Sequence, residues 1–120
     1  MNNKLQGYTR FILAACACLA GSISISSALA VTQTGPLPIT RIRTGWVADQ
    51  FAIETNQTIV NPAGCIAPNG YISNISDPGY KTYYAAVLMA FALGKKVTVI
   101  ISDTECMAST PKIIGIYVEQ

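Results

Sequence analysis

The residues that this 120-residue chain lacks restrict the chemistry that it could perform. The sequence contains no histidine, which excludes Ser-His-Asp and Cys-His nucleophiles and removes the usual zinc and copper ligands. It also lacks the GxGxxG and GxxxxGK[ST] motifs of phosphate-binding loops. Asp103 and Glu105 are a close acidic pair that a small hydrolase could use, but acid–base work needs a pocket and a set separation, and solvated surface carboxylates are favoured. We therefore expect a protein that is not an enzyme and that has no metal and no cofactor.

Aromatic side chains are the best candidates for binding. Trp46 and Tyr71 combine an apolar face with a polar tip, which suits sugar stacking and protein interfaces. Trp46 falls where an extended segment meets a turn, so a core position and an exposed platform both remain open. The helical spacing of Tyr80, Tyr83 and Tyr84 favours packing of a helix over ligand binding.

Residues 1–30 have the organisation of a signal peptide. Lys4 and Arg10 precede an apolar run at 11–20, and Ala28, Leu29 and Ala30 form the A-x-A pattern of a signal-peptidase site. The run is shorter than the roughly 20 apolar residues of a spanning helix, so we expect no transmembrane segment in the mature chain. The sequence therefore predicts cleavage after Ala30 and export to the periplasm or the medium.

A lipid anchor is the alternative reading of the same segment. The sequence at 13–16, Leu-Ala-Ala-Cys, resembles a bacterial lipobox in which Cys16 would be lipidated. Only five residues separate Arg10 from Cys16, which is short for an apolar core. Export as a free protein is favoured, and attachment to the envelope stays open.

Two cysteines remain after residue 30, and they predict a disulfide. An even pair in an exported chain indicates one bond, Cys65–Cys106. Their spacing is not that of a CxxC redox or metal pair, and no histidine is present to complete a metal site.

Residues 31–120 form one small domain with balanced charge. They carry six basic and six acidic side chains, so no basic surface for nucleic acid is expected. Residues 31–38 are rich in Gly, Pro and Thr and predict a flexible leader, which leaves residues 39–120 as the domain. Alternating or β-branched patterns predict strands near 39–47, 51–53 and 71–73, a short extended piece at 58–60, and strands at 97–102 and 113–118. Residues 102–111, which include Cys106, are expected to form a loop.

A helix is predicted between the third and fourth strands. Asp77 is a good N-cap, Pro78 suits the first helical position, and Gly94 suits the stop. Seven residues recur with helical spacing and predict the core side: Tyr80, Tyr83, Tyr84, Val87, Leu88, Phe91 and Ala92. The opposite side is apolar too, so it is buried either in the core or against another subunit, with Ala86, Met89 and Leu93 as candidate interface residues.

The segment from Tyr83-Tyr84-Ala85-Ala86 to Gly94-Lys95-Lys96-Val97-Thr98-Val99 resembles the exported B subunits of pentameric bacterial toxins of the subtilase-cytotoxin and typhoid-toxin type. The chain also resembles small uncharacterised secreted proteins of proteobacteria, which share the apolar helix, a G-K-K-V sequence and a second cysteine before P-K-I-I. The toxin resemblance implies an OB-fold, a ring of subunits with the helix facing its centre, and a carbohydrate ligand. In those subunits the disulfide joins two segments that precede the helix, whereas Cys65 and Cys106 lie on either side of it.

These observations predict a small α+β domain, either an OB-like β-barrel or an antiparallel sheet of about five strands, with one apolar helix and one disulfide. The predicted function is an exported non-enzymatic binding module, a homo-oligomer in one reading, that binds a glycan or a protein surface. The alternative is a periplasmic or envelope lipoprotein with a structural or inhibitory protein-binding role.

Overall fold

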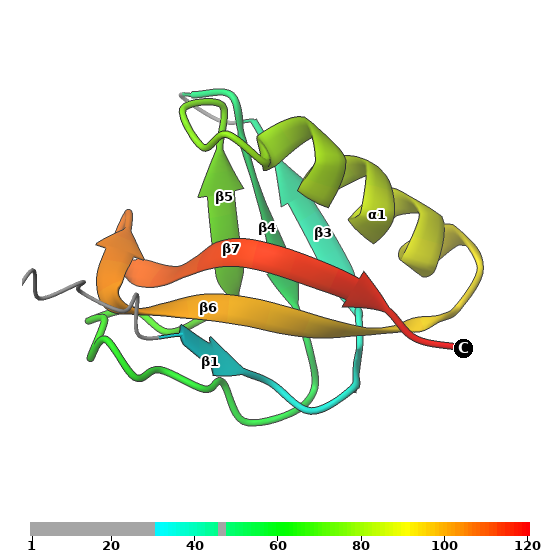
Figure 1. Cartoon of the computed structure of the whole chain (residues 1–120), viewed down its shortest axis with the longest axis horizontal. Helices are drawn as coiled ribbons and strands as arrows, with labels where there is room; N and C mark the ends of the chain where they lie inside the picture. The colour runs from blue at the N-terminus through cyan, green and yellow to red at the C-terminus, as the bar shows by residue number, and fades with distance from the viewer. Residues whose placement is uncertain (1–30, 46–47) are drawn as a thin grey trace, which may run out of the picture.

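The computed structural model describes residues 31–45 and 48–120, in which one helix packs on a mixed β-sheet (Figure 1). The predicted signal peptide, its cleavage site at Ala28 and Ala30, the lipobox cysteine Cys16 and the candidate binding residue Trp46 lie outside the described residues. The elements are β1 (Val31–Gln33), β2 (Leu37–Pro38), β3 (Arg41–Thr44), β4 (Gln50–Glu54), β5 (Tyr71–Asn74), α1 (Tyr80–Ala92), β6 (Lys96–Met107) and β7 (Thr110–Val118).

The strands lie in the order β1-β6-β7-β5-β4-β3, and β2 also pairs with β6. Neighbours are antiparallel except β5 and β7, which run parallel at Ile72 and Lys112. The small α+β class is confirmed, but the sheet has seven strands rather than about five. Because five of these strands precede the helix, α1 lies between the fifth and sixth strands, not between the third and fourth.

The additional strands, β1 and β2, come from residues 31–38, which the sequence predicted as a flexible leader. Leu37 is buried against the core, with 2% of its surface exposed. Thr34 donates its N–H to the Val99 carbonyl and accepts the Val99 N–H on its hydroxyl, both at 2.9 Å. These contacts are made with a strand more than sixty residues away, so local composition did not indicate them.

The predicted loop at 102–111 is instead the far part of a long β6–β7 hairpin. Its register moves from Ile101 opposite Ile113 to Cys106 opposite Pro111, so four residues of β6 bulge opposite Lys112 alone. The polar residues of this bulge gave it the appearance of a loop. The hairpin closes through a two-residue turn in which Ala108 and Ser109 both have positive φ.

Helix α1 begins two residues later than predicted, at Tyr80 rather than Pro78. Gly79 is the N-cap residue and Asp77 makes no cap hydrogen bond; its backbone carbonyl accepts the Tyr80 N–H while its side chain turns back toward β5. The glycine stop is confirmed, because Gly94 has φ of +62° and the Lys95 N–H donates to the Ala90 carbonyl at 2.8 Å.

The core lies between α1 and the sheet. Tyr80, Val87 and Ala90 form the buried side of the helix. They join one cluster with buried side chains from the strands, which are Leu37, Phe51, Ile53, Tyr71, Val97, Val99, Ile101 and Ile113. The 58–60 segment is not a strand, but Ile59 and Val60 pack against this cluster. The predicted disulfide is confirmed: Cys65 and Cys106 are bonded, with their Cα atoms 5.7 Å apart.

Candidate interface on the exposed side of the helix

The exposed side of α1 is apolar along most of its length. Six side chains form this surface, which we call the outer face: Ala85, Leu88, Met89, Phe91, Ala92 and Leu93. The exposed fractions of its larger members are 43% for Leu88, 51% for Met89, 47% for Phe91 and 65% for Leu93. Lys81 is the only charged residue within the thirteen residues of α1. A contiguous apolar surface of this kind is typical of a protein–protein contact.

The structure separates the predicted interface residues. Met89 and Leu93 lie on the outer face, while Ala86 is half-buried at its border. Leu88, Phe91 and Ala92 were predicted on the core side and are exposed. Because α1 is apolar on every side, its periodicity could not show which face meets the sheet.

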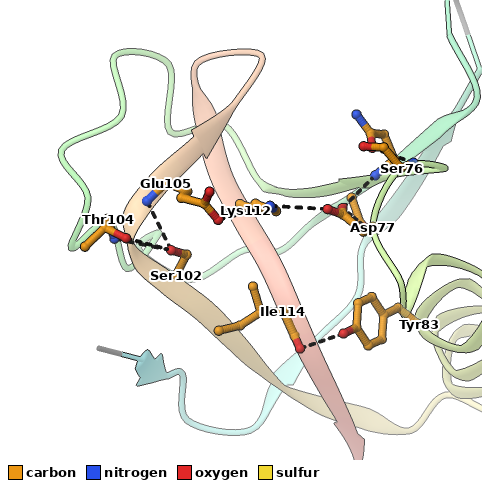
Figure 2. Close-up of polar contacts among 10 residues, drawn as sticks. Ser76, Asp77, Tyr83, Ser102, Thr104, Glu105, Lys112 and Ile114 are labelled. Carbon is orange, nitrogen blue, oxygen red and sulfur yellow. Dashed lines mark hydrogen bonds and ion pairs between the residues drawn. The ribbon is translucent and has the colours of Figure 1, made fainter. Parts of the chain in front are cut away.

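The tyrosines of α1 hold the helix to the sheet. The Tyr83 hydroxyl donates to the Ile114 carbonyl on β7 at 2.7 Å (Figure 2). The rings of Tyr80 and Tyr84 pack on Phe51, with centroids 5.6 Å and 5.2 Å away. Their predicted role in packing the helix is confirmed, and the outer face is therefore presented by an anchored helix.

Tyr80 also fixes the start of the helix to the β3–β4 turn. Its hydroxyl donates to Asp49 Oδ1 at 2.5 Å. This hydrogen bond to a carboxylate, together with burial, raises the pKa of Tyr80 to about 12. No local pattern in the sequence indicated this pair, because 31 residues separate its members.

The raised pKa makes stability sensitive to alkaline pH. A folded-state pKa of about 12, against 10.0 for an unperturbed tyrosine, means that the contribution of Tyr80 is complete below pH 10 and is lost as the pH rises toward 12. In the Tyr80→Phe variant we expect a smaller fall in the free energy of unfolding between pH 10 and 12, measured by urea titration. Lys112, whose pKa is also raised, is present in both proteins, so the difference isolates Tyr80. Identical pH slopes would contradict the assignment.

A polar cluster lies where β5, β6 and β7 approach one another (Figure 2). Lys112 Nζ is 3.0 Å from Glu105 Oε2 and 3.3 Å from Asp77 Oδ1. The hydrogen bond to Glu105, followed by that to Asp77, raises the pKa of Lys112 although burial opposes the shift. Asp77 Oδ2 accepts from the Ser73 hydroxyl at 2.7 Å. The cluster links three strands, and Glu105 serves it as an ion-pair partner.

Asp103 and Tyr71, two further candidates among the described residues, are not part of this cluster. Asp103 is half-buried in the β6 bulge, beside but not within the ion pairs of Lys112. Tyr71 has no exposed surface, and its hydroxyl accepts the Val60 N–H at 2.9 Å. Tyr71, a candidate binding residue, therefore lies with its ring in the core. Spacing could not show this, since its burial depends on the 58–60 segment and the neighbouring strands.

The described residues include one shallow pocket at β3, β4 and β5, with a volume of about 40 Å³. It is lined by Arg43, Thr44, Gly45, Gln50, Ala52 and Ile72. Such a volume holds a few water molecules rather than a sugar ring.

Across residues 31–45 and 48–120, no three His, Cys, Asp or Glu side chains are grouped to hold a metal ion. No helix in this part of the chain is long and apolar enough to cross a membrane.

No protein-family model matches the chain, and the curated proteins contain no match to it. The candidate function therefore depends on the surfaces described above.

Proposed function

We propose that this protein is an exported, non-enzymatic binding module that assembles with copies of itself through the outer face of α1. The observation that carries the proposal is the exposure of four large apolar side chains on an anchored helix: Leu88, Met89, Phe91 and Leu93. Burying this face against a second copy would remove it from water without requiring the fold to change. The ligand of the assembly would be a glycan or a protein surface, bound at several equivalent sites.

The order of the strands supports an OB-like architecture for the module. When residues 31–44 are taken as one interrupted first strand, the remaining elements follow as β4, β5, α1, β6 and β7. The helix then comes between the third and fourth strands of five. In this description β1 and β2 pair the first strand with β6, and β3 pairs it with β4. Because β6 and β4 are the two end strands of the remaining order β6-β7-β5-β4, the first strand contacts both ends of the sheet. A partly open five-stranded barrel has this kind of connection.

A multivalent assembly would also suit a site as small as the pocket at β3, β4 and β5. Weak single sites on one oligomer reach a high overall affinity when they engage a surface that carries many copies of the ligand. The shallow pocket at β3, β4 and β5 is compatible with a site of this weak type. Export, which the first 30 residues predict, would place the module where such surfaces occur.

The test is the absolute mass in solution of the oxidised, exported protein, measured by light scattering. We expect a defined oligomer for the wild type and a monomer for Met89→Lys, because a buried ammonium at the centre of an apolar contact has no partner. Met89 is 51% exposed in the single chain, so this change leaves the core intact.

The matched control is Ile66→Lys, which adds the same charge at a site 90% exposed and distant from α1 in sequence. It should keep the oligomeric mass of the wild type. A monomeric wild type, or an oligomer that survives Met89→Lys, would contradict the proposal. A monomer would favour instead a protein-binding role at the cell envelope.

A further inference from the structure

The connection between β4 and β5 carries the most exposed large apolar side chain of the described residues. Ile66 has 90% of its surface exposed. The preceding residue, Cys65, is 4% exposed and is bonded to Cys106 on β6. The chain therefore passes from a covalent anchor to full exposure in one residue. Single exposed apolar residues are common, so exposure alone carries no conclusion.

The backbone before Ile66 is held by Asn61 as well as by the disulfide. The Asn61 amide donates to the Cys65 carbonyl at 2.9 Å and its oxygen accepts the Cys65 N–H at 2.8 Å. One side chain thus occupies both backbone groups of the residue that precedes Ile66. This arrangement fixes the direction in which the chain enters the exposed position.

The backbone after Ile66 is held by the tip of the β6–β7 hairpin. The Ala67 N–H donates to the Ser109 carbonyl at 2.8 Å, and the Thr110 hydroxyl donates to the Ala67 carbonyl at 3.0 Å. Both neighbours of Ile66 are therefore tied to the same hairpin. The N–H and C=O of Ile66 itself make no hydrogen bond within the described part of the chain, and they are available to a partner.

We propose that this segment, residues 64–68, inhibits a serine protease by occupying its active-site cleft, with the Ile66 side chain in the S1 pocket. The S1 pocket accepts a single side chain, and a short branched aliphatic group suits the small apolar pocket of the elastase class. Complexes of proteases with protein inhibitors form between surfaces that change little on binding. A loop already fixed on both sides of its exposed residue loses little conformational freedom on binding, which favours tight association.

The tethers also explain how such a loop would resist being consumed. The protease serine oxygen bonds to the Ile66 carbonyl carbon and forms an ester while the Ile66–Ala67 bond breaks, and Ala67 leaves as an amine that receives the serine proton through the protease histidine. Ala67 stays attached to the hairpin through Ser109 and Thr110, while the acyl part stays attached through the disulfide. The amine remains beside the acyl group and re-forms the peptide bond, which releases the serine unchanged.

The loop is separate from the outer face of α1. In Figure 1 the green connection between β4 and β5 lies on the side of the β6–β7 turn, and α1 lies on the other side of the view. The inhibitory loop and the self-association surface therefore use different residues. This separation allows the two proposals to be tested independently.

The experiment measures inhibition of pancreatic elastase and of trypsin, each with its chromogenic peptide substrate. The oxidised wild-type protein should inhibit elastase and not trypsin. In Ile66→Lys, elastase inhibition should weaken by about 100-fold or more, as for a central contact residue, and trypsin inhibition should appear because the trypsin S1 pocket carries a carboxylate. Ile75→Lys is the matched control: Ile75 is 57% exposed outside the loop, so this variant should behave as the wild type toward both enzymes.

Further variants separate a fixed loop from an ordinary substrate. Asn61→Ala should weaken inhibition and permit cleavage between residues 66 and 67, detected by mass spectrometry. Met89→Lys should inhibit elastase like the wild type, whatever its oligomeric state. Two results would overturn the proposal. In the first, elastase cleaves the wild-type protein between residues 66 and 67 and is not inhibited by it. In the second, the wild type does not inhibit elastase and the Ile66→Lys variant does not inhibit trypsin.

Discussion

Replacing both Cys65 and Cys106 with alanine is expected to lower the free energy of unfolding by about 4 kcal/mol. The bond joins residues 41 apart in sequence, so its removal frees a long loop in the unfolded chain. A small domain has a total stability of roughly 5–15 kcal/mol, and the loss would be a large share of it. Urea denaturation of the wild type and the double variant under oxidising conditions measures the difference.

The double-alanine variant is the appropriate comparison because it leaves no buried hydroxyl or free thiol. Suppose that the bond acts by restricting the unfolded chain and that its loop is already closed in the folding transition state. Removing the bond should then slow folding more than it speeds unfolding. Cys65 is also held in the native state by its hydrogen bonds to Asn61. A variant as stable as the wild type would show that these contacts, rather than the covalent bond, hold the β4–β5 connection in place.

The parts of the fold that the sequence predicted well are those with a local cause. Gly94 ends the helix because a residue in the left-handed conformation is needed there. The position of this glycine after the apolar run is enough to predict where the helix ends. The β-branched run at 97–102 lies within β6, and the tyrosine spacing led to the correct assignment of the residues that pack the helix. The disulfide followed from the number of cysteines after residue 30.

The parts that were predicted wrongly depend on contacts between distant segments. Strands β1 and β2 have a loop-like composition, and only the hydrogen bonds between Thr34 and Val99 and the burial of Leu37 make them part of the sheet. Tyr71 has the chemistry of a binding residue, yet tertiary packing places it in the core. In both cases the contacts that decide the structure are made with segments distant in sequence, which the local pattern does not show.

The candidate surfaces likewise combine a feature that the local sequence indicates with features that depend on distant contacts. The sequence suggested that α1 has a second apolar side, but could not distinguish it from the first, and so Leu88 and Phe91 were assigned to the core. Ile66 lies among turn residues with no periodicity, so no pattern in the sequence marks it. Its significance depends on Asn61 and on the hairpin tip, whose Ser109 and Thr110 lie more than forty residues further along the chain.

Gly70→Ala is expected to lower the free energy of unfolding by about 3 kcal/mol, as for other substitutions that force atoms into a packed site. Gly70 precedes β5, where the backbone passes close to β4. A Cβ atom at this position would lie inside van der Waals contact of the Ile53 carbonyl oxygen. Relief would require a shift of the backbone, because the obstacle is not the end of a flexible side chain.

The two strands leave little room for such a shift. Ile53 has no exposed surface and pairs with Tyr71, which is also fully buried, so moving either strand disturbs the centre of the core. The control is Gly35→Ala, because a Cβ there meets no atom within 4 Å, and its effect should stay within about 0.5 kcal/mol. Chemical denaturation of both variants gives the comparison. Equal stabilities would mean that β4 and β5 can separate at this point, and that the contact between the strands does not require glycine at position 70.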